Sequence, residues 1–299
     1  MHAQLIAELA LLGLATGFLA GLLGITPLLK ACSPLRLINA AVPSDTHTRL
    51  ADQAYGPAGR QRLDVYLPVT LAPEAPIAVF FYGGSWSSGE RADYRFAGEA
   101  LASRGIVTLV ADYRLSPEVR YPVFLQDSAQ AVRWAAERAA SFGASRDRLF
   151  IVGHSAGAYN AAMLALDPRW LGGVGLSPGQ LAGWVGLAGP YDFLPLTNVD
   201  AMPVFHHPNY PANSQPLDHV QPGAPRALLL AALEDDLVNP QRNTAGLAKR
   251  LGAAQVPVLV KMHTRVNHIT LVAALSRPLR WMAPVLNDVV QFIQGPASH

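Results

Sequence analysis

Short apolar runs recur along residues 63–262 and dominate the pattern of hydrophobic and polar positions. In the first run, Leu63, Val65 and Leu67 alternate with Asp64 and Tyr66, which predicts a half-buried strand. The runs that follow are mainly apolar and predict buried strands. They cover residues 77–81, 106–110, 149–152, 185–188, 227–233 and 256–262. The chain is therefore expected to build a sheet from strands spread over most of its length.

Helical segments separate several of these strands. Residues 95–104 predict a helix that ends at Gly105, and residues 126–142 predict a longer helix because apolar side chains recur at helical spacing. The recurring positions are Ala129, Val132, Ala136 and Ala139. Strands that alternate with helices predict an α/β fold, with a mostly parallel central sheet and helices on both faces.

The segment from Gly153 to Gly157 has the layout of a strand, a tight turn and a helix. It reads Gly153-His154-Ser155-Ala156-Gly157 and lies between an apolar run and a run of small residues. This is the pattern of a nucleophile elbow, in which side chains at the two glycines would clash with the neighbouring strand and helix. Ser155 is therefore the candidate nucleophile.

A serine hydroxyl needs a base to accept its proton and an acid to orient that base. His268 follows the last predicted strand and precedes a helical pattern, where a base-bearing loop belongs, whereas His263 is still at the strand end and is interpreted as structural. The acid lies among Glu234, Asp235 and Asp236 after the strand at 227–233. Neighbouring side chains leave a strand in opposite directions, so at most one of the two aspartates is expected to face His268.

An upstream loop offers donors for an oxyanion. Gly83-Gly84-Ser85 follows the buried run 77–81, and glycine lets backbone amides approach a substrate closely. The predicted donors are the amides of Ala156, Gly84 and Ser85.

The N-terminal part of the chain is of a different kind. Residues 5–29 are apolar except for Glu8 and a few small or neutral residues, which predicts a signal or membrane anchor. An amphipathic helix packed on the domain is the alternative. We therefore predict a leader at 1–32, a linker at 33–48 and a catalytic domain at 49–299, with export to a membrane-attached or periplasmic location. Residues 29–32, ending in Cys32, resemble the end of a bacterial lipoprotein signal, although Lys30 departs from it.

A proline-rich stretch interrupts the regular pattern at residues 202–225. It predicts an irregular excursion that lies above the active site as a short lid or pocket wall. His206, His207 and His219 fall within it, but no carboxylate or cysteine follows at ligand spacing, so no metal site is predicted.

Composition limits the classes of function. The chain has 299 residues, of which 51% are hydrophobic, enough for one large α/β domain. The net charge is +2 with scattered Lys and Arg, which predicts no nucleic-acid partner. The single Cys32 excludes a disulfide within one chain.

Three motifs in order carry a family resemblance. The segment 82–86 resembles a His-Gly-Gly-x-Trp loop, with Tyr82 in place of the histidine, and 112–118 resembles an Asp-Tyr-Arg-Leu-Ala-Pro-Glu block. With the elbow, they resemble the α/β-hydrolase superfamily over roughly residues 61–293. The nearest groups are hormone-sensitive-lipase-like, kynurenine-formamidase-like and feruloyl-esterase-like esterases.

The resemblance implies an α/β-hydrolase fold and hydrolysis of carboxylic esters without cofactor or metal. Relatives place the acid three residues before a core valine, which implies Asp235 when counted from Val238, with Asp236 as the runner-up. It also implies that Asp112 and Arg114 fix loops, and that the Tyr82 hydroxyl keeps a hydrogen bond.

We therefore expect a serine carboxylesterase that acts on small-molecule esters with short to medium chains, because a proline-rich lid of this length is too short to shelter a long acyl chain. An arylformamidase or another amide hydrolase, including an exopeptidase, would use the same residues. A non-catalytic binding protein on the same fold is the third alternative.

Overall fold

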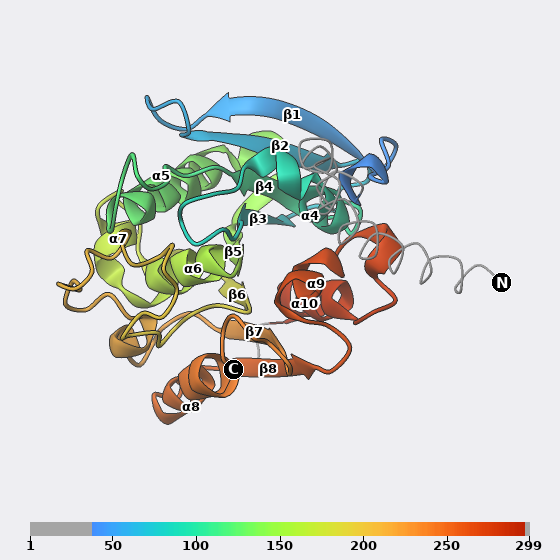
Figure 1. Cartoon of the computed structure of the whole chain (residues 1–299). Coiled ribbons are helices and arrows are strands. Elements are labelled where there is room, and N and C mark those ends of the chain that lie inside the picture. The colour runs from blue at the N-terminus through green and yellow to red at the C-terminus, as the bar shows by residue number, and fades with distance from the viewer. Residues whose placement is uncertain (1–37, 297–299) are drawn as a thin grey trace, which may run out of the picture.

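The computed structural model describes residues 38–296, and its centre is an eight-stranded sheet with the order β1-β2-β4-β3-β5-β6-β7-β8 (Figure 1). The strands are β1 (His47–Ala54), β2 (Arg62–Pro68), β3 (Ala75–Phe81), β4 (Val107–Ala111), β5 (Ala144–His154), β6 (Gly183–Leu187), β7 (Ala227–Ala232) and β8 (Val258–His263). Only the β1–β2 and β2–β4 pairs are antiparallel. The predicted mostly parallel sheet is confirmed.

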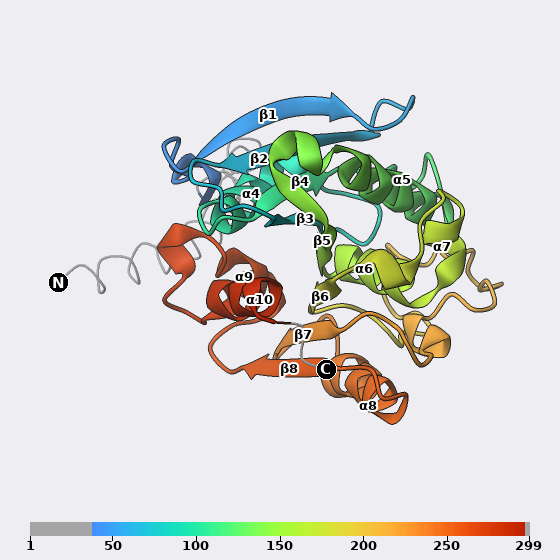
Figure 2. The ribbon, with the colours of Figure 1, turned by 180° about the vertical axis from the view of Figure 1, so that it is seen from behind.

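Helices cover both faces of this sheet, as predicted. The α-helices are α4 (Arg95–Ala102), α5 (Val123–Arg138), α6 (Ala156–Leu166), α7 (Pro168–Gly172), α8 (Gly246–Ala253), α9 (His268–Ala273) and α10 (Val285–Gln294). Figures 1 and 2 show α4, α9 and α10 on one face, with α5, α6, α7 and α8 on the other. Short 3-10 turns lie at Arg91–Tyr94, Ala140–Phe142, Pro178–Gln180, Pro216–His219 and Arg277–Leu279, and a π-helical turn lies at Gln241–Ala245.

The core follows from the apolar runs. Every residue of β3, β4, β6 and β7 is buried, because helices cover these strands on both sides. The edge strand β1 was not predicted, since almost all of its side chains are exposed and give no apolar pattern.

The prediction that β2 is half-buried was wrong. Asp64 is buried because its carboxylate is ion-paired with Arg49 at 2.7 Å and with Arg91 at 3.1 Å. Tyr66 is buried because its ring lies against Gly98 of α4, where an added Cβ would come within 2.5 Å of the ring. A partner for the charge and a glycine on the covering helix thus allow both polar positions to face inward.

Part of the segment predicted as a linker is attached to the domain. The Asn39 side chain donates to the carbonyls of Ala92 and Asp93 and accepts from the amide of Phe96. The strand β1 begins at His47, two residues before the predicted start of the domain. The predicted leader at 1–32, with Cys32, lies outside the described residues. Within residues 38–296, no helix combines the length and apolar character needed to cross a membrane.

Candidate active site

The turn between β5 and α6 holds Ser155 in a strained backbone conformation, with φ 54° and ψ −121°. The Ser155 amide donates to the Leu187 carbonyl of β6 at 2.8 Å, which ties the turn to the sheet. A Cβ at Gly153 would lie 2.1 Å from the Gly157 carbonyl oxygen, and one at Gly157 would lie 2.1 Å from the Phe81 carbonyl oxygen. Only glycine fits at either position, so the turn keeps Ser155 at the start of α6.

Three predicted side chains form one hydrogen-bonded chain. Nε2 of His268 lies 2.9 Å from Oγ of Ser155, and Nδ1 of His268 lies 2.8 Å from Oδ2 of Asp235. Glu234 and Asp236, the other two acids considered, are exposed. Of the three acids, Asp235 is therefore the one that contacts the base. His263 lies at the end of β8, where its Nε2 is 3.2 Å from the Asp288 carboxylate.

The Asp235 carboxylate is held in its charged form. Burial raises the pKa of Asp235, but hydrogen bonds from His268 and from two backbone amides outweigh this effect and lower the pKa below its ordinary value. The amides of Leu237 and Val238 donate to Oδ1 at 2.9 and 2.8 Å, leaving Oδ2 for His268. An ionised Asp235 accepts the Nδ1 proton of His268, so Nε2 is free to accept a proton from Ser155.

A second histidine, His154, contacts the backbone of the proposed base, a role that was not predicted from the sequence. His154 is buried beside Ser155, and its Nε2 lies 3.0 Å from the carbonyl oxygen of His268. Burial and the neighbouring His268 lower the pKa of His154 to about 3, so the ring is neutral near pH 7 and its Nε2–H donates to this carbonyl. Its place inside the elbow motif is the only sequence signal that could have pointed to it.

The loop after β3 presents unpaired amides next to Ser155. Gly84, Ser85 and Trp86 all have positive φ, at 129°, 51° and 56°. No described residue accepts a hydrogen bond from the amides of Gly84, Ser85 or Ala156. The structure therefore leaves all three predicted donors available to a ligand, from a backbone that is strained at Ser85 and Trp86.

Tyr82 stands at the position of the histidine in the His-Gly-Gly-x-Trp loop, and its side chain supports the loop after β3. Its hydroxyl donates to Oδ1 of Asp112 at 2.7 Å and accepts from Arg60 at 2.7 Å. Burial raises the pKa of Tyr82, so the hydroxyl stays protonated and can donate. Arg114 binds Asp127 through two nitrogens, at 2.9 and 2.7 Å. Asp112 and Arg114 thus fix loops, in line with the expected structural role.

A cavity of about 120 Å³ opens over Ser155. Apart from Ser155, Ala156 and His268, it is lined by Ser85, Trp86, Pro190, Phe193, Leu196, Thr197, Asn198, Ala201, Leu237 and Val238. One wall of this cavity is formed by positions 190–201, which belong to the segment between β6 and β7, residues 188–226. The proposed lid at 202–225 was therefore misplaced, since none of its described residues lines the cavity.

Residues 202–225 support this wall from outside. Phe205 is buried, and its ring centre lies 4.9 Å from that of Trp86 and 5.1 Å from that of Phe193. The Trp86 indole also donates to Asn160 of α6 at 2.9 Å, a contact that the sequence analysis missed.

The histidines of the β6–β7 segment have separate partners. His206 contacts the Tyr121 carbonyl, His207 contacts the Tyr210 hydroxyl and His219 contacts the Asn213 carbonyl. Over residues 38–296, no group of three or more His, Cys, Asp or Glu side chains is arranged to hold a metal ion.

Comparison with known proteins identifies the family. A family model, BD-FAE, matches residues 63–251, which is more than half of the chain. The chain belongs to the BD-FAE family. The matched part of this BD-FAE protein includes Gly84, Ser155 and Asp235 and ends before His268.

Individual relatives of this BD-FAE protein are esterases by name. It is 33% identical over 149 residues to a probable isoprenylcysteine alpha-carbonyl methylesterase of Oryza sativa subsp. japonica, covering 48% of this chain and 35% of the relative. It is 38% identical over 111 residues to carboxylesterase NlhH of Mycobacterium tuberculosis, covering 36% and 34%. The chain thus aligns with about a third of the length of these two relatives.

A solved esterase from Pyrobaculum calidifontis has the same fold, with a TM-score of 0.69, 20% identity and coverage of 87% of this chain and 88% of that one. The α/β-hydrolase fold of the esterase and lipase type, which the three motifs implied, is confirmed for this BD-FAE protein.

Proposed function

We propose that this protein is a serine carboxylesterase that hydrolyses small carboxylic esters with short to medium acyl chains. The observation that carries the proposal is the hydrogen-bonded chain from Ser155 through His268 to Asp235, which opens into a cavity beside unpaired backbone amides. Membership of the BD-FAE family and the names of the relatives support the same chemistry.

The proposed reaction runs in two halves. Oγ of Ser155 attacks the ester carbonyl carbon while Nε2 of His268 takes its proton, and the carbonyl oxygen becomes an oxyanion that accepts from the amides of Gly84, Ser85 and Ala156. The intermediate collapses, the alcohol leaves with the proton from His268, and an acyl-Ser155 ester remains. Water then attacks this ester with His268 again as base, which releases the carboxylic acid and restores Ser155.

The cavity supports the preference for small esters. A cavity of about 120 Å³ holds a short acyl chain, and its walls at Trp86, Phe193 and Leu196 are apolar. We expect a higher kcat/KM on C2 to C6 acyl esters than on C12 to C16 esters.

The test is covalent labelling combined with kinetics. A fluorophosphonate should label the native protein at Ser155, and Ser155→Ala should abolish labelling and lower kcat on an activated ester by a factor on the order of 10⁶, as in a serine protease. Labelling that survives this substitution would refute the assignment. Parallel assays on a matched ester and anilide separate an esterase from an amide hydrolase, and a burst of acyl-enzyme separates a catalyst from a binding protein.

A further inference from the structure

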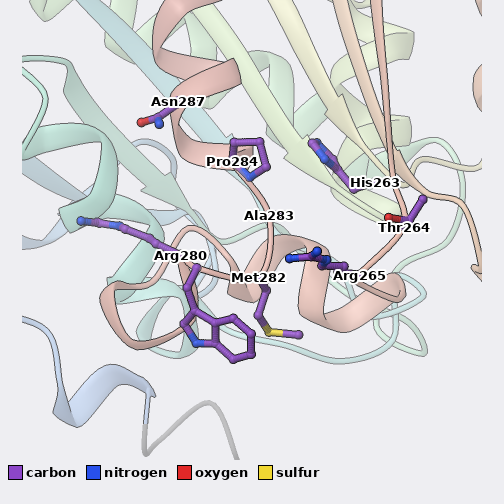
Figure 3. Close-up of a pocket in the computed structure, with 9 residues that line it drawn as sticks. His263, Thr264, Arg265, Arg280, Met282, Ala283, Pro284 and Asn287 are labelled. Carbon is purple, nitrogen blue, oxygen red and sulfur yellow. The ribbon is translucent and has the colours of Figure 1, made fainter. Parts of the chain in front are cut away.

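A second hollow, of about 400 Å³, lies beside the carboxyl end of β8 and is separate from the cavity over Ser155 (Figure 3). One wall comes from His263 at the end of β8 and the next two residues, and the other from residues 280–284 and from Asn287 in the first turn of α10. Figure 3 shows Arg265 on the first wall and Arg280 on the second. Trp281, at 70% exposure, is one of the most exposed large apolar side chains among the described residues.

Among the described residues, the hollow itself is lined by two cations, Arg265 and Arg280, and by no Asp or Glu, and it belongs to a longer stretch of the sequence that lacks acids. Residues 237–287 contain no Asp or Glu, although the whole chain has 21 of these residues against 23 Lys and Arg. The cations in this stretch are Arg242, Lys249, Arg250, Lys261, Arg265, Arg277 and Arg280. Glu99 is paired with Arg277 and Arg280. Asp288 lies 3.2 Å from His263, whose pKa is lowered by burial, so this carboxylate keeps its negative charge beside the hollow. Arg265 is exposed and has no ion pair within residues 38–296.

The start of the described chain lies at the same end of the sheet. The hydrogen bonds of Asn39 to Ala92, Asp93 and Phe96 hold it at the beginning of α4, just after the loop that leaves the carboxyl end of β3. From there the chain passes along α4, and the Thr46 hydroxyl donates to Glu99, the same carboxylate that binds Arg277 and Arg280. The apolar sequence 5–29 therefore precedes a point that shares this end of the molecule with the hollow.

We propose that a basic face, defined by Lys261, Arg265, Trp281 and Met282, lies against the headgroups of a bilayer that contains anionic phospholipids. Anionic headgroups attract exposed Lys and Arg, and an indole is favoured at the boundary between headgroups and acyl chains. The apolar sequence 5–29, which precedes the described residues in the chain, has the composition of a bilayer-binding segment. Nucleic acid or an acidic protein would also attract the cations, but neither accounts for the exposed Trp281 or for the apolar sequence in the N-terminal part of the chain.

The test follows Trp281 on vesicles, with the full chain. Vesicles of brominated phosphatidylcholine, with or without phosphatidylglycerol, quench tryptophans that enter the headgroup region. We expect phosphatidylglycerol to increase quenching, Trp281→Phe to remove the quenched component, and Arg265→Glu to reduce it severalfold. The matched control is Arg146→Glu, because Arg146 is exposed at the amino end of β5, on the opposite end of the sheet, and should leave quenching unchanged.

Several results would overturn this proposal. Equal quenching in native protein and Trp281→Phe would show that Trp281 stays out of the bilayer, even if residues 5–29 hold the chain on the vesicle. Equal quenching on neutral and anionic vesicles, or an equal effect of Arg146→Glu, would remove the role of the basic face. Heparin binding that depends on Arg265 without any quenching on vesicles would assign the face to a soluble polyanion instead. Each readout is independent of ester hydrolysis.

Discussion

The elbow between β5 and α6 and the segment between β6 and β7 both contribute to the cavity over Ser155, but they do so in different ways. The elbow is fixed by backbone contacts so close that Gly153 and Gly157 tolerate no side chain. The β6–β7 segment contains one 3-10 turn, Pro216–His219, as its regular structure and reaches the cavity through side chains. The sheet thus positions Ser155, whereas one wall of the cavity comes from an irregular segment that can change without altering the sheet.

Within this comparison, the largest effect is expected for the residues that the sheet positions. Asp235→Asn should lower kcat by about 10⁴-fold with the fold intact, because an amide cannot hold the required tautomer of His268. The neighbouring Asp236→Asn serves as the matched control and should cost about tenfold or less, since Asp236 is exposed. Steady-state kinetics with circular dichroism on both variants checks this, and the opposite ranking would assign the acid to Asp236.

A smaller effect is predicted at the cavity wall. Leu196→Ala removes a buried apolar side chain from the wall and makes room for a longer acyl chain. The ratio of kcat/KM on C8 esters to kcat/KM on C4 esters should therefore rise by about tenfold, which corresponds to the free energy of burying one or two methylene groups. Asn209→Ala, in the part of the segment that does not line the cavity, should leave this ratio unchanged. If the C8 to C4 ratio of kcat/KM shifted in Asn209→Ala and not in Leu196→Ala, residues 202–225 would form the cavity wall after all.

A hydrogen bond between the β6–β7 segment and the loop after β3 gives the next prediction. Nδ2 of Asn198, from the wall, donates to Oγ of Ser85 at 3.1 Å in the loop that carries the predicted oxyanion donors. Asn198→Ala should lower kcat by about two- to tenfold with little change in KM. This factor corresponds to the free energy that one neutral hydrogen bond contributes. In the Ser85→Ala background the same substitution should have almost no further effect. Additive losses in this double-mutant cycle would mean that the two side chains act independently.

A further prediction concerns stability against acid. The pKa of His154 is about 3 in the folded protein and about 6.5 when unfolded, so below pH 6.5 only the unfolded state binds a proton at this residue. Its contribution to stability is therefore lost as the pH falls, by about 1.4 kcal/mol per pH unit between pH 6 and 4. In urea denaturation, His154→Gln should show a shallower fall in unfolding free energy over this range. An unchanged slope would contradict a neutral, buried His154.

The sequence predicted the part of the fold that apolar periodicity encodes. The buried strands, Ser155 and His268 could be located from apolar runs and from motifs at strand ends, which meet at one edge of a parallel sheet. The choice of Asp235 among three neighbouring acids came from the family resemblance. The edge strand β1 could not be predicted from exposed side chains, and the burial of Asp64 depends on Arg91, far away in the sequence. The cavity wall was misplaced for a related reason: proline marks where regular structure stops, but not which side chains turn inward.

The contact between His154 and the carbonyl of His268 has a consequence for motion. The proposed base is tethered to the strand that carries Ser155, in addition to its own loop after β8. Displacement of residues 264–267, for example by a molecule that occupies the neighbouring hollow, would have to break this tether before it separated His268 from Ser155. The position of His268 relative to Ser155 thus depends on a hydrogen bond from the core of the sheet as well as on the conformation of the loop after β8.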